Sequence, residues 1–128
     1  MRQPWSAEDQ ARIAATESFR IAPYRADGKT PGTPTYIWFV QVEGRLFVRA
    51  YSGTGSRWFQ AGLHQRAGQI VLDGTPREVT FAPVDPALSG AIDAAYRAKY
   101  TTSRYLAPMI SDRAQAATLE VLPRAAAA

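Results

Sequence analysis

The pattern of polar and apolar residues predicts two helices that flank the rest of the chain. Ser6 followed by Asp9 resembles a capping box and predicts the first helix, over residues 6–18. Asp85-Pro86 supplies an N-cap and a first-turn proline for the second helix, which is expected to end near Tyr100. The apolar stripe of this second helix has spacings of four, three and one residues and consists of Leu88, Ile92, Ala95 and Tyr96.

Six other segments have the alternating or densely apolar pattern of β-strands. The expected strands are Phe19–Tyr24, Thr35–Val42, Arg45–Tyr51, Gln69–Leu72, Arg77–Phe81 and Ala117–Leu122. Short turns at Glu43-Gly44 and at residues 73–76 are typical of hairpins. Thr35–Val42 is so apolar that we expect both of its faces to be covered. Hairpins combined with few helices favour a small antiparallel barrel over a parallel sheet.

The strand Arg45–Tyr51 has two different faces, because successive side chains of a strand point to opposite sides. Small aliphatic residues occupy one face, as expected for a barrel interior: Leu46, Val48 and Ala50. The other face combines aromatic residues with an arginine, Phe47, Arg49 and Tyr51. We interpret this second face as a ligand surface or a subunit interface.

Composition places the chain among bacterial cytoplasmic proteins of a single domain spanning residues 1–128, with 123–128 as a frayed tail. Its 128 residues are 46% hydrophobic and 20% charged, which is typical of a globular protein. No apolar run is long enough for a membrane span, and the N-terminus lacks the apolar segment of an export signal. The absence of cysteine excludes disulfides and zinc–thiolate sites.

Positive charge is concentrated in the middle of the chain. The segment from Arg20 to Arg66 contains seven basic and two acidic residues, a net charge of +5, whereas the whole chain carries +4. Arginines interleaved with apolar strand residues are not typical of a nucleic-acid surface, so we rank nucleic-acid binding lowest. A site for one or two phosphates of a small molecule needs only two or three of these charges.

The loop after the third expected strand is the strongest candidate for an anion site. Residues 52–57 read Ser-Gly-Thr-Gly-Ser-Arg, and Trp58 then begins a short predicted helix that runs to Gln65. Two glycines allow close approach of the backbone, and three hydroxyls and a guanidinium add donors. The alternative interpretation is a plain connection in which Ser56 or Thr54 caps the helix.

Known catalytic motifs do not match this chain. A phosphate loop ending at Gly28-Lys29 would need glycine at the position of Pro23, and the loop 52–57 fits neither the dinucleotide pattern nor the hydrolase elbow. His64 is the single histidine, so metal centres of several imidazoles and a Ser–His triad have little support, and no metal is expected.

The order of these features nevertheless resembles the flavin-binding split-barrel proteins, which include pyridoxamine-phosphate-oxidase-like and deazaflavin-dependent nitroreductase-like enzymes. The resemblance covers roughly residues 6–124 and is carried by the turn 25–29, the loop 52–57, Trp58 and the hairpin 70–79. It is strongest to a bacterial domain-of-unknown-function family that we place in this superfamily. It implies an α+β fold, mainly β, built as a small six-stranded antiparallel split barrel with flanking helices, and a homodimer.

The resemblance also implies a site for flavin mononucleotide or deazaflavin, and an oxidoreductase that acts on a small molecule. The cofactor would be held by Arg25, Lys29, Arg49, Ser52, Gly53, Thr54, Gly55, Ser56, Arg57 and Trp58. Trp38 and Tyr51 would contact the substrate or cover the conjugated ring, and protons would come from Tyr100, Tyr105 or His64. Basic residues are fewer here than in the flavin-binding branches, so two alternatives remain. One is a cofactor-independent isomerase, cyclase or hydrolase that uses the same apolar pocket, and the other is a non-catalytic binding module.

Overall fold

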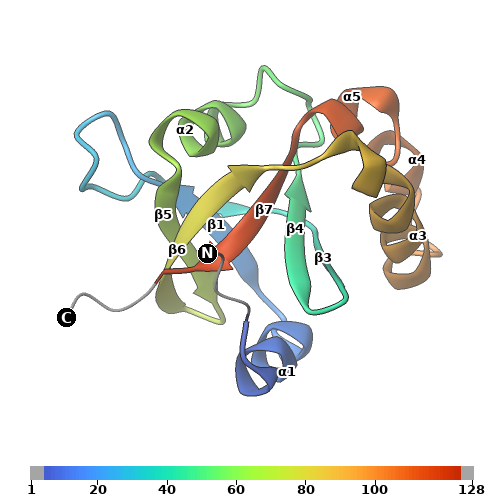
Figure 1. Ribbon diagram of the computed structural model, residues 1–128, viewed down its shortest axis with the longest axis horizontal. Coiled ribbons are helices and arrows are strands. Elements are labelled where there is room, and N and C mark those ends of the chain that lie inside the picture. The colour runs from blue at the N-terminus through green and yellow to red at the C-terminus, as the bar shows by residue number, and fades with distance from the viewer. Residues whose placement is uncertain (1–4, 125–128) are drawn as a thin grey trace.

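The computed structural model describes residues 5–124, which form one antiparallel sheet with helices at its ends and on its outer side (Figure 1). The strands are β1 (Phe19–Pro23), β2 (Thr35–Tyr36), β3 (Phe39–Val42), β4 (Arg45–Arg49), β5 (Ala67–Leu72), β6 (Thr75–Pro83) and β7 (Thr118–Pro123). The helices are α1 (Ala7–Ala15), α2 (Arg57–Gln65), the 3-10 turn η1 (Pro86–Leu88), α3 (Ser89–Lys99), α4 (Leu106–Met109) and α5 (Asp112–Ala116). The fold is therefore α+β and is built on one antiparallel sheet, but the expectation of a mainly β chain was wrong, because the helices together contain slightly more residues than the strands.

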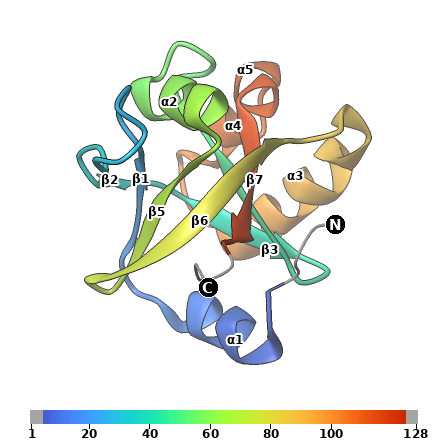
Figure 2. The same cartoon turned by 60° about the vertical axis from the view of Figure 1, so that its left-hand side comes forward.

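The sheet curls into a half-barrel because two strands that follow one another in the chain lie at its opposite edges. The strand order is β2-β1-β5-β6-β7-β4-β3, and neighbouring strands are antiparallel. β2 pairs with β1, whereas β3 pairs with β4, and only residues 37–38 separate them. So short a connection can join the two edges only if the sheet bends back on itself (Figure 2).

The expectation of six strands was wrong in this segment, because Thr35–Val42 is divided into two strands. The Ile37 amide still donates to the Phe19 carbonyl at 3.4 Å, after which the chain leaves β1 and joins β4. The expectation that both faces of the segment are covered was also wrong for Thr35 and Tyr36, which are exposed. Phe39 in β3 is buried as expected.

Two hydrophobic clusters lie on the two faces of the sheet. The inner cluster fills the half-barrel and includes Leu46, Val48 and Ala50, as the alternation along this strand predicted. The outer cluster lies between the sheet and α3 and includes Phe47, Ile92 and Tyr96. The interpretation of the face formed by Phe47, Arg49 and Tyr51 as a ligand surface or subunit interface was wrong for Phe47 and Arg49, which the outer helices cover and which are almost completely buried. Tyr51, beyond the end of β4, is exposed.

The local signals for helix starts and turns are confirmed. The Ser6 hydroxyl accepts the Asp9 amide at 3.1 Å, and the Asp85 carboxylate accepts the Ala87 amide at 2.9 Å. The second hairpin turns at Asp73 and Gly74, which both have positive φ angles, of 49° and 86°. The Asp73 carboxylate also accepts the amides of residues 17 and 18, so this turn holds the end of the α1 segment.

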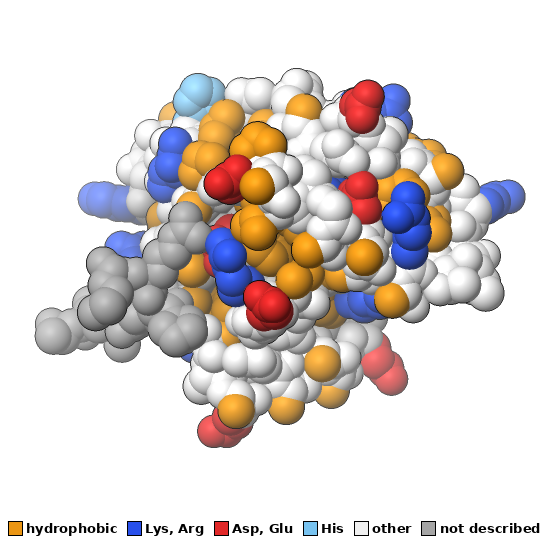
Figure 3. All heavy atoms as spheres, turned by 45° about the vertical axis from the view of Figure 1, so that its right-hand side comes forward, with side chains coloured by type: hydrophobic (Ala, Val, Ile, Leu, Met, Phe, Trp, Pro, Cys, Tyr) orange, Lys and Arg blue, Asp and Glu red, His pale blue; other side chains and the backbone are white. Residues whose placement is uncertain are grey.

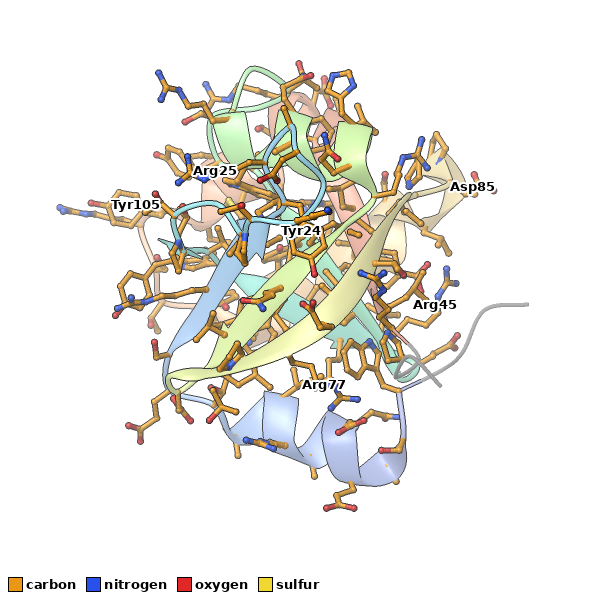
Figure 4. The ribbon with its side chains drawn as sticks, turned by 90° about the vertical axis from the view of Figure 1, so that its left-hand side faces the viewer. Tyr24, Arg25, Arg45, Arg77, Asp85 and Tyr105 are labelled. Carbon is orange, nitrogen blue, oxygen red and sulfur yellow. The ribbon has the colours of Figure 1, made fainter. Side chains whose placement is uncertain are left out.

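Helices α1 and α2 lie at the two ends of the half-barrel, and α3, α4 and α5 lie on its outer side (Figures 1 and 2). Arg77 on β6 points towards α1 (Figure 4) and forms two hydrogen bonds with the Asp9 carboxylate, at 2.8 and 3.0 Å. The Trp5 indole donates to the Val121 carbonyl at 2.8 Å. These contacts attach the N-terminal helix to the last two strands.

The last strand extends further towards the C-terminus than the sequence predicted. Pro123 belongs to β7 and not to the tail expected over 123–128, and residues 125–128 lie outside the described residues. Within residues 5–124, no helix has the length and apolar character that a membrane crossing requires.

Candidate functional site

A cavity of about 490 Å³ lies where the loop after β4, the start of α2 and the segment 35–38 meet, and we call it the ring cavity. Its aromatic walls are Tyr36, Trp38, Tyr51, Trp58 and Tyr105. Its polar groups come from Thr35, Arg49, Ser52 and Ser56, and Ile37 and Met109 complete the lining. A concave, mainly apolar cavity with a few polar groups is the usual form of a small-molecule site.

Four parts of the chain contribute these side chains, apart from Arg49 in β4. Tyr51 and Ser52 follow β4 directly, and Ser56 and Trp58 stand at the start of α2. Residues 35–38 line the cavity from the crossing between the sheet edges. Tyr105 and Met109, at the two ends of α4, line it from the outer side. Tyr51 and Tyr105 meet edge to face, with ring centroids 6.2 Å apart.

The start of α2 leaves several backbone donors without an acceptor. Ser56 is the N-cap, but its side chain forms no capping hydrogen bond. In the part of the chain that the structure describes, the amides of residues 57–59 have no acceptor, as is normal for the first turn of a helix. Gly53 and Ser56, in contrast, donate their amides to the carbonyls of Ala50 and Gly53. The helix dipole adds partial positive charge at the same place.

The loop 52–57 separates two cavities, so only part of it faces the ring cavity. Ser52 and Ser56 line the ring cavity, whereas Thr54 lines a second cavity of about 560 Å³ that also contacts Gln60 and Gln115. Gly53 is buried and has a φ angle of 86°, and an added Cβ would stand 2.5 Å from the Arg113 side chain. Gly53 therefore shapes the loop, whereas Ser52 and Ser56 are the loop residues that border the ring cavity.

Arg49 borders the ring cavity but is committed to a buried network. Its Nε donates to the Thr118 hydroxyl at 3.1 Å, and its Nη1 donates to the Asp93 carboxylate and to the Met109 carbonyl. Its Nη2 reaches the Ser89 carbonyl at 3.4 Å. Because the side chain is fully buried and its charge is paired, Arg49 holds the outer helices against β4 and β7.

Arg25 and Lys29 do not line the ring cavity, and both are exposed in the loop between β1 and β2. Figure 4 labels Arg25 in this loop. Asp27 organises this loop by accepting three hydrogen bonds, from the Lys29 amide and from the amide and hydroxyl of Thr30. The Thr30 hydrogen bonds lower the pKa of Asp27 to about 2. Gly28 approaches Gln65 at the C-terminal end of α2, so these two charges are not beside Arg57, which begins the helix.

The three predicted proton donors occupy three different places. Tyr105 lines the ring cavity. The Tyr100 hydroxyl donates to the Phe39 carbonyl at 3.2 Å and accepts the Phe39 amide at 3.3 Å, and this residue lines a different cavity. His64 is exposed in the last turn of α2, at the end opposite to the ring cavity.

Sequence reasoning missed one pair at this site, Arg20 and Tyr36. Arg20 stacks on the Tyr36 ring, 4.1 Å from its centroid, and donates a hydrogen bond to its hydroxyl. This hydrogen bond is the main reason why the pKa of Tyr36 is lowered. The two residues are direct partners in the β1–β2 ladder, so the correct strand pairing would have revealed them.

Comparison with known proteins identifies the family. A bacterial family described as "Uncharacterized protein conserved in bacteria (DUF2255)" matches residues 9–121. The chain belongs to this family. The DUF2255 chain is also similar in structure to a conserved hypothetical protein, Rv2991, from Mycobacterium tuberculosis, known from its crystal structure. The TM-score is 0.60 at 18% sequence identity, over 97% of this chain and 82% of the other, which shows a shared fold. No curated protein matches.

The DUF2255 site combines aromatic walls with a few polar residues, Ser52 and Ser56 among them. The start of α2, which contributes Ser56 and Trp58 to the lining, also has free backbone amides. Among residues 5–124 no group of three or more acidic or histidine side chains is placed to hold a metal ion.

Proposed function

We propose that the ring cavity binds flavin mononucleotide or deazaflavin and that the protein is an oxidoreductase acting on a small molecule. The observation that supports this most strongly is the combination of an aromatic cavity with unpaired amides at the start of α2. Bound cofactor of this kind supplies hydride transfer, and the protein contributes binding, orientation and exclusion of water. This function accords with a split barrel of the flavin-binding type.

The walls of the ring cavity fit the conjugated part of the cofactor. Tyr51, before the loop 52–57, and Trp58, after it, both line the cavity. Trp38 lines it from the crossing segment. Aromatic rings stack on one another with a gain of about 0.5–1.5 kcal/mol beyond the buried area. We assign ring contact to Trp58 and Tyr51, and substrate contact to Trp38.

The phosphate or other anionic part would lie at the start of α2. Ser52 and Ser56 line the cavity there, and the amides of residues 57–59 are free. Arg57 is exposed and is not one of the lining residues, so its guanidinium would reach the anion from the rim of the cavity. Charge-assisted hydrogen bonds contribute about 1.5–3 kcal/mol each, so three of them would support micromolar binding. Of the predicted proton donors, Tyr105 is the one that borders this cavity.

Exposed aromatic residues around the cavity support a homodimer as part of this proposal. Within the described chain, the exposed large hydrophobic residues are Tyr36, Tyr51 and Tyr105, with exposures of 65%, 44% and 46%. All three line the ring cavity. Exposed apolar surface concentrated at one place is typical of a ligand or partner site, and a second copy would shield the cofactor from water. We place this dimer in the bacterial cytoplasm.

One observation favours the cofactor-independent alternative. Among residues 5–124, Arg49 is the one basic side chain that lines the ring cavity, and its charge is already paired with Asp93. An isomerase, cyclase or hydrolase acting on an apolar substrate would use the same aromatic walls without needing a phosphate site. Such a protein would be colourless and would not respond to either cofactor.

Nucleic-acid binding is not favoured by the surface. On the face shown in Figure 3, basic and acidic side chains alternate with hydrophobic ones, and neither sign forms a continuous stripe. A nucleic-acid surface normally concentrates positive charge on one face.

The test is an absorbance and fluorescence titration of the purified protein with flavin mononucleotide and with deazaflavin. We expect saturable quenching with one of them, and Arg57→Ala should weaken binding about tenfold, the loss of about 1.4 kcal/mol. Arg97→Ala is the matched control, because it removes the same charge from an exposed position on α3. No spectral change with either cofactor would refute the proposal, and equal titrations of wild type and Arg57→Ala would refute the anion site.

A further inference from the structure

A third cavity borders the crossing segment next to the ring cavity, and Lys99 is one of its lining residues. This lysine cavity has a volume of about 440 Å³ and shares the segment 36–38 with the ring cavity. Its aromatic walls include Phe19, Trp38, Phe39 and Tyr100, and Lys99 at the end of α3 supplies the amine. The proposed cofactor function makes no use of this cavity.

The Lys99 amine is fixed in one position although the residue as a whole is exposed. Its Nζ donates a hydrogen bond to the Phe39 carbonyl at 2.8 Å. It also stands over the Phe39 ring, 3.1 Å from the centroid, and 5.2 Å from the centroid of the Tyr100 ring. An amine held by one N–H in this way keeps its lone pair available once it is neutral.

Burial and the aromatic contacts act in opposite directions on the charge of this amine. Burial lowers the pKa of Lys99 to about 8, although the aromatic faces attract the ammonium form. The other titratable groups on the cavity wall are Glu17, Tyr36 and Tyr100. At pH 7.5 roughly a quarter of such amines are neutral, compared with about one in a thousand at an ordinary lysine.

We propose that Lys99 forms Schiff bases with small aromatic aldehydes or ketones that bind in the lysine cavity. The aromatic walls select a flat apolar body, and the amine reacts with a carbonyl group placed beside it. A carbonyl compound fits better than a carboxylate, because Glu17 adds negative charge to the same wall. Desolvation of the amine points in the same direction, since it disfavours the ammonium that a carboxylate would require.

The reaction needs no oxidant and no reductant. The nitrogen lone pair of Lys99 attacks the carbonyl carbon and forms a C–N bond, while the π electrons of the C=O bond move to oxygen, which takes a proton. The resulting carbinolamine loses a second nitrogen-bound proton and its oxygen as water, which leaves a C=N bond. One amine and one carbonyl compound therefore give one imine and one water.

The chain offers an internal control, because Lys29 is its one other lysine. Lys29 lies in the exposed β1–β2 loop, outside the lysine cavity. We would treat the folded protein with benzaldehyde and cyanoborohydride at pH 7.5, which reduces and traps the imine. Mass spectrometry of the peptides then gives the rates at Lys99, at Lys29 and at the N-terminal amine separately. Lys99 should react at least about tenfold faster than Lys29, because its larger neutral fraction outweighs its lower intrinsic nucleophilicity.

A second measurement tests the cavity independently of the reactivity of the amine. The ratio of benzaldehyde to propanal labelling should be at least about threefold higher at Lys99 than at Lys29, because the aromatic walls enrich the aromatic reagent. Lys99→Arg should abolish the fast labelling and Lys29→Arg should leave it. Equal rates at the two lysines would overturn the proposal, and equal reagent ratios would overturn the aromatic selectivity. Both comparisons are made within the wild-type chain, so they hold even if Lys99→Arg fails to fold.

Discussion

Trp38 lies flat on Tyr100, with ring centroids 3.9 Å apart and an angle of 7° between the rings. Trp38 lines both the ring cavity and the lysine cavity, so this stack fixes the wall between them. The Tyr100 hydroxyl holds the wall from behind, because it bonds both the amide and the carbonyl of Phe39. The end of α3 thus anchors Phe39, the first residue of β3 after the crossing between the two sheet edges.

The first prediction concerns this anchor. Tyr100→Phe should lower the free energy of unfolding by about 1–2 kcal/mol, because the backbone of Phe39 loses a hydrogen-bond partner. The same variant should leave cofactor titration within about twofold of wild type, since Tyr100 does not line the ring cavity. Urea unfolding and fluorescence titration measure the two effects, with the exposed Tyr105→Phe as the control for stability. Loss of cofactor binding in Tyr100→Phe would contradict this structural role.

The second prediction uses the two glycines of the loop 52–57 as a matched pair. Gly53→Ala should destabilise the fold by more than about 1 kcal/mol, because φ is 86° and the new Cβ would stand 2.5 Å from Arg113. Gly55→Ala should change stability by less than about 0.5 kcal/mol, since no atom lies within 4 Å of its new Cβ. Thermal and urea unfolding provide the comparison. Equal stabilities of the two variants would show that the loop has a different conformation.

The third prediction separates the two sides of the same loop. Ser56→Ala should weaken cofactor binding about threefold to tenfold, because Ser56 lines the ring cavity and its hydroxyl is not used to cap α2. Its effect on stability should stay below the usual cost of about 1 kcal/mol for removing an N-cap, since this side chain makes no capping hydrogen bond. Thr54→Ala is the control and should bind like wild type, because Thr54 lines the second cavity. If Thr54→Ala weakened cofactor binding more than Ser56→Ala, the ligand would lie in the second cavity and the proposed site would be wrong.

The fourth prediction concerns pH and the α1 contact. Hydrogen bonds from Arg77 lower the pKa of Asp9, so the native state favours the ionised carboxylate. The resulting stability is present above the unfolded pKa near 4 and is lost as the pH falls through the lower native value. Asp9→Asn should therefore cost about 0.5–1 kcal/mol at pH 7, a modest amount because both side chains are partly exposed. The difference from wild type should shrink towards zero below about pH 3, and a constant difference would contradict the ion pair.

The fifth prediction concerns the buried network of Arg49. Arg49→Met should destabilise the protein by about 3–5 kcal/mol, because Asp93 would keep only the hydrogen bond from Gln115. Arg97→Met removes an exposed arginine of the same length from α3 and should change stability by less than about 0.5 kcal/mol. Similar urea midpoints for the two variants would show that the network does not hold the outer helices.

The helix starts and hairpin turns could be predicted from the sequence because their signals are local. Ser6, Asp85 and the Asp73-Gly74 turn each act on residues within a few positions, and the structure confirms all three. The alternation along β4 likewise identified the inner face of the half-barrel correctly. These signals gave an antiparallel sheet, but they carry no information about which strands become neighbours.

The division of the segment 35–42 could not be predicted, because it depends on pairing with two distant strands. Its apolar run has the pattern of one continuous strand, but its first residues pair with β1 and its last residues pair with β4. The same limit applies to the candidate site. The sequence presents Arg49 as a ligand residue, but in the structure it is bonded to Asp93 of α3 and buried. Ser56 and Thr54 line different cavities, and this depends on how the outer helices pack.

The position of β7 between β6 and β4 has a consequence for how this protein folds during translation. The strand that joins the two parts of the sheet is the last one to leave the ribosome. Until then β4 and β6 each expose an unpaired edge, and unpaired edges invite pairing with other chains. Pairing of β7 with both edges therefore removes two sites at which a partly synthesised chain could pair with other molecules.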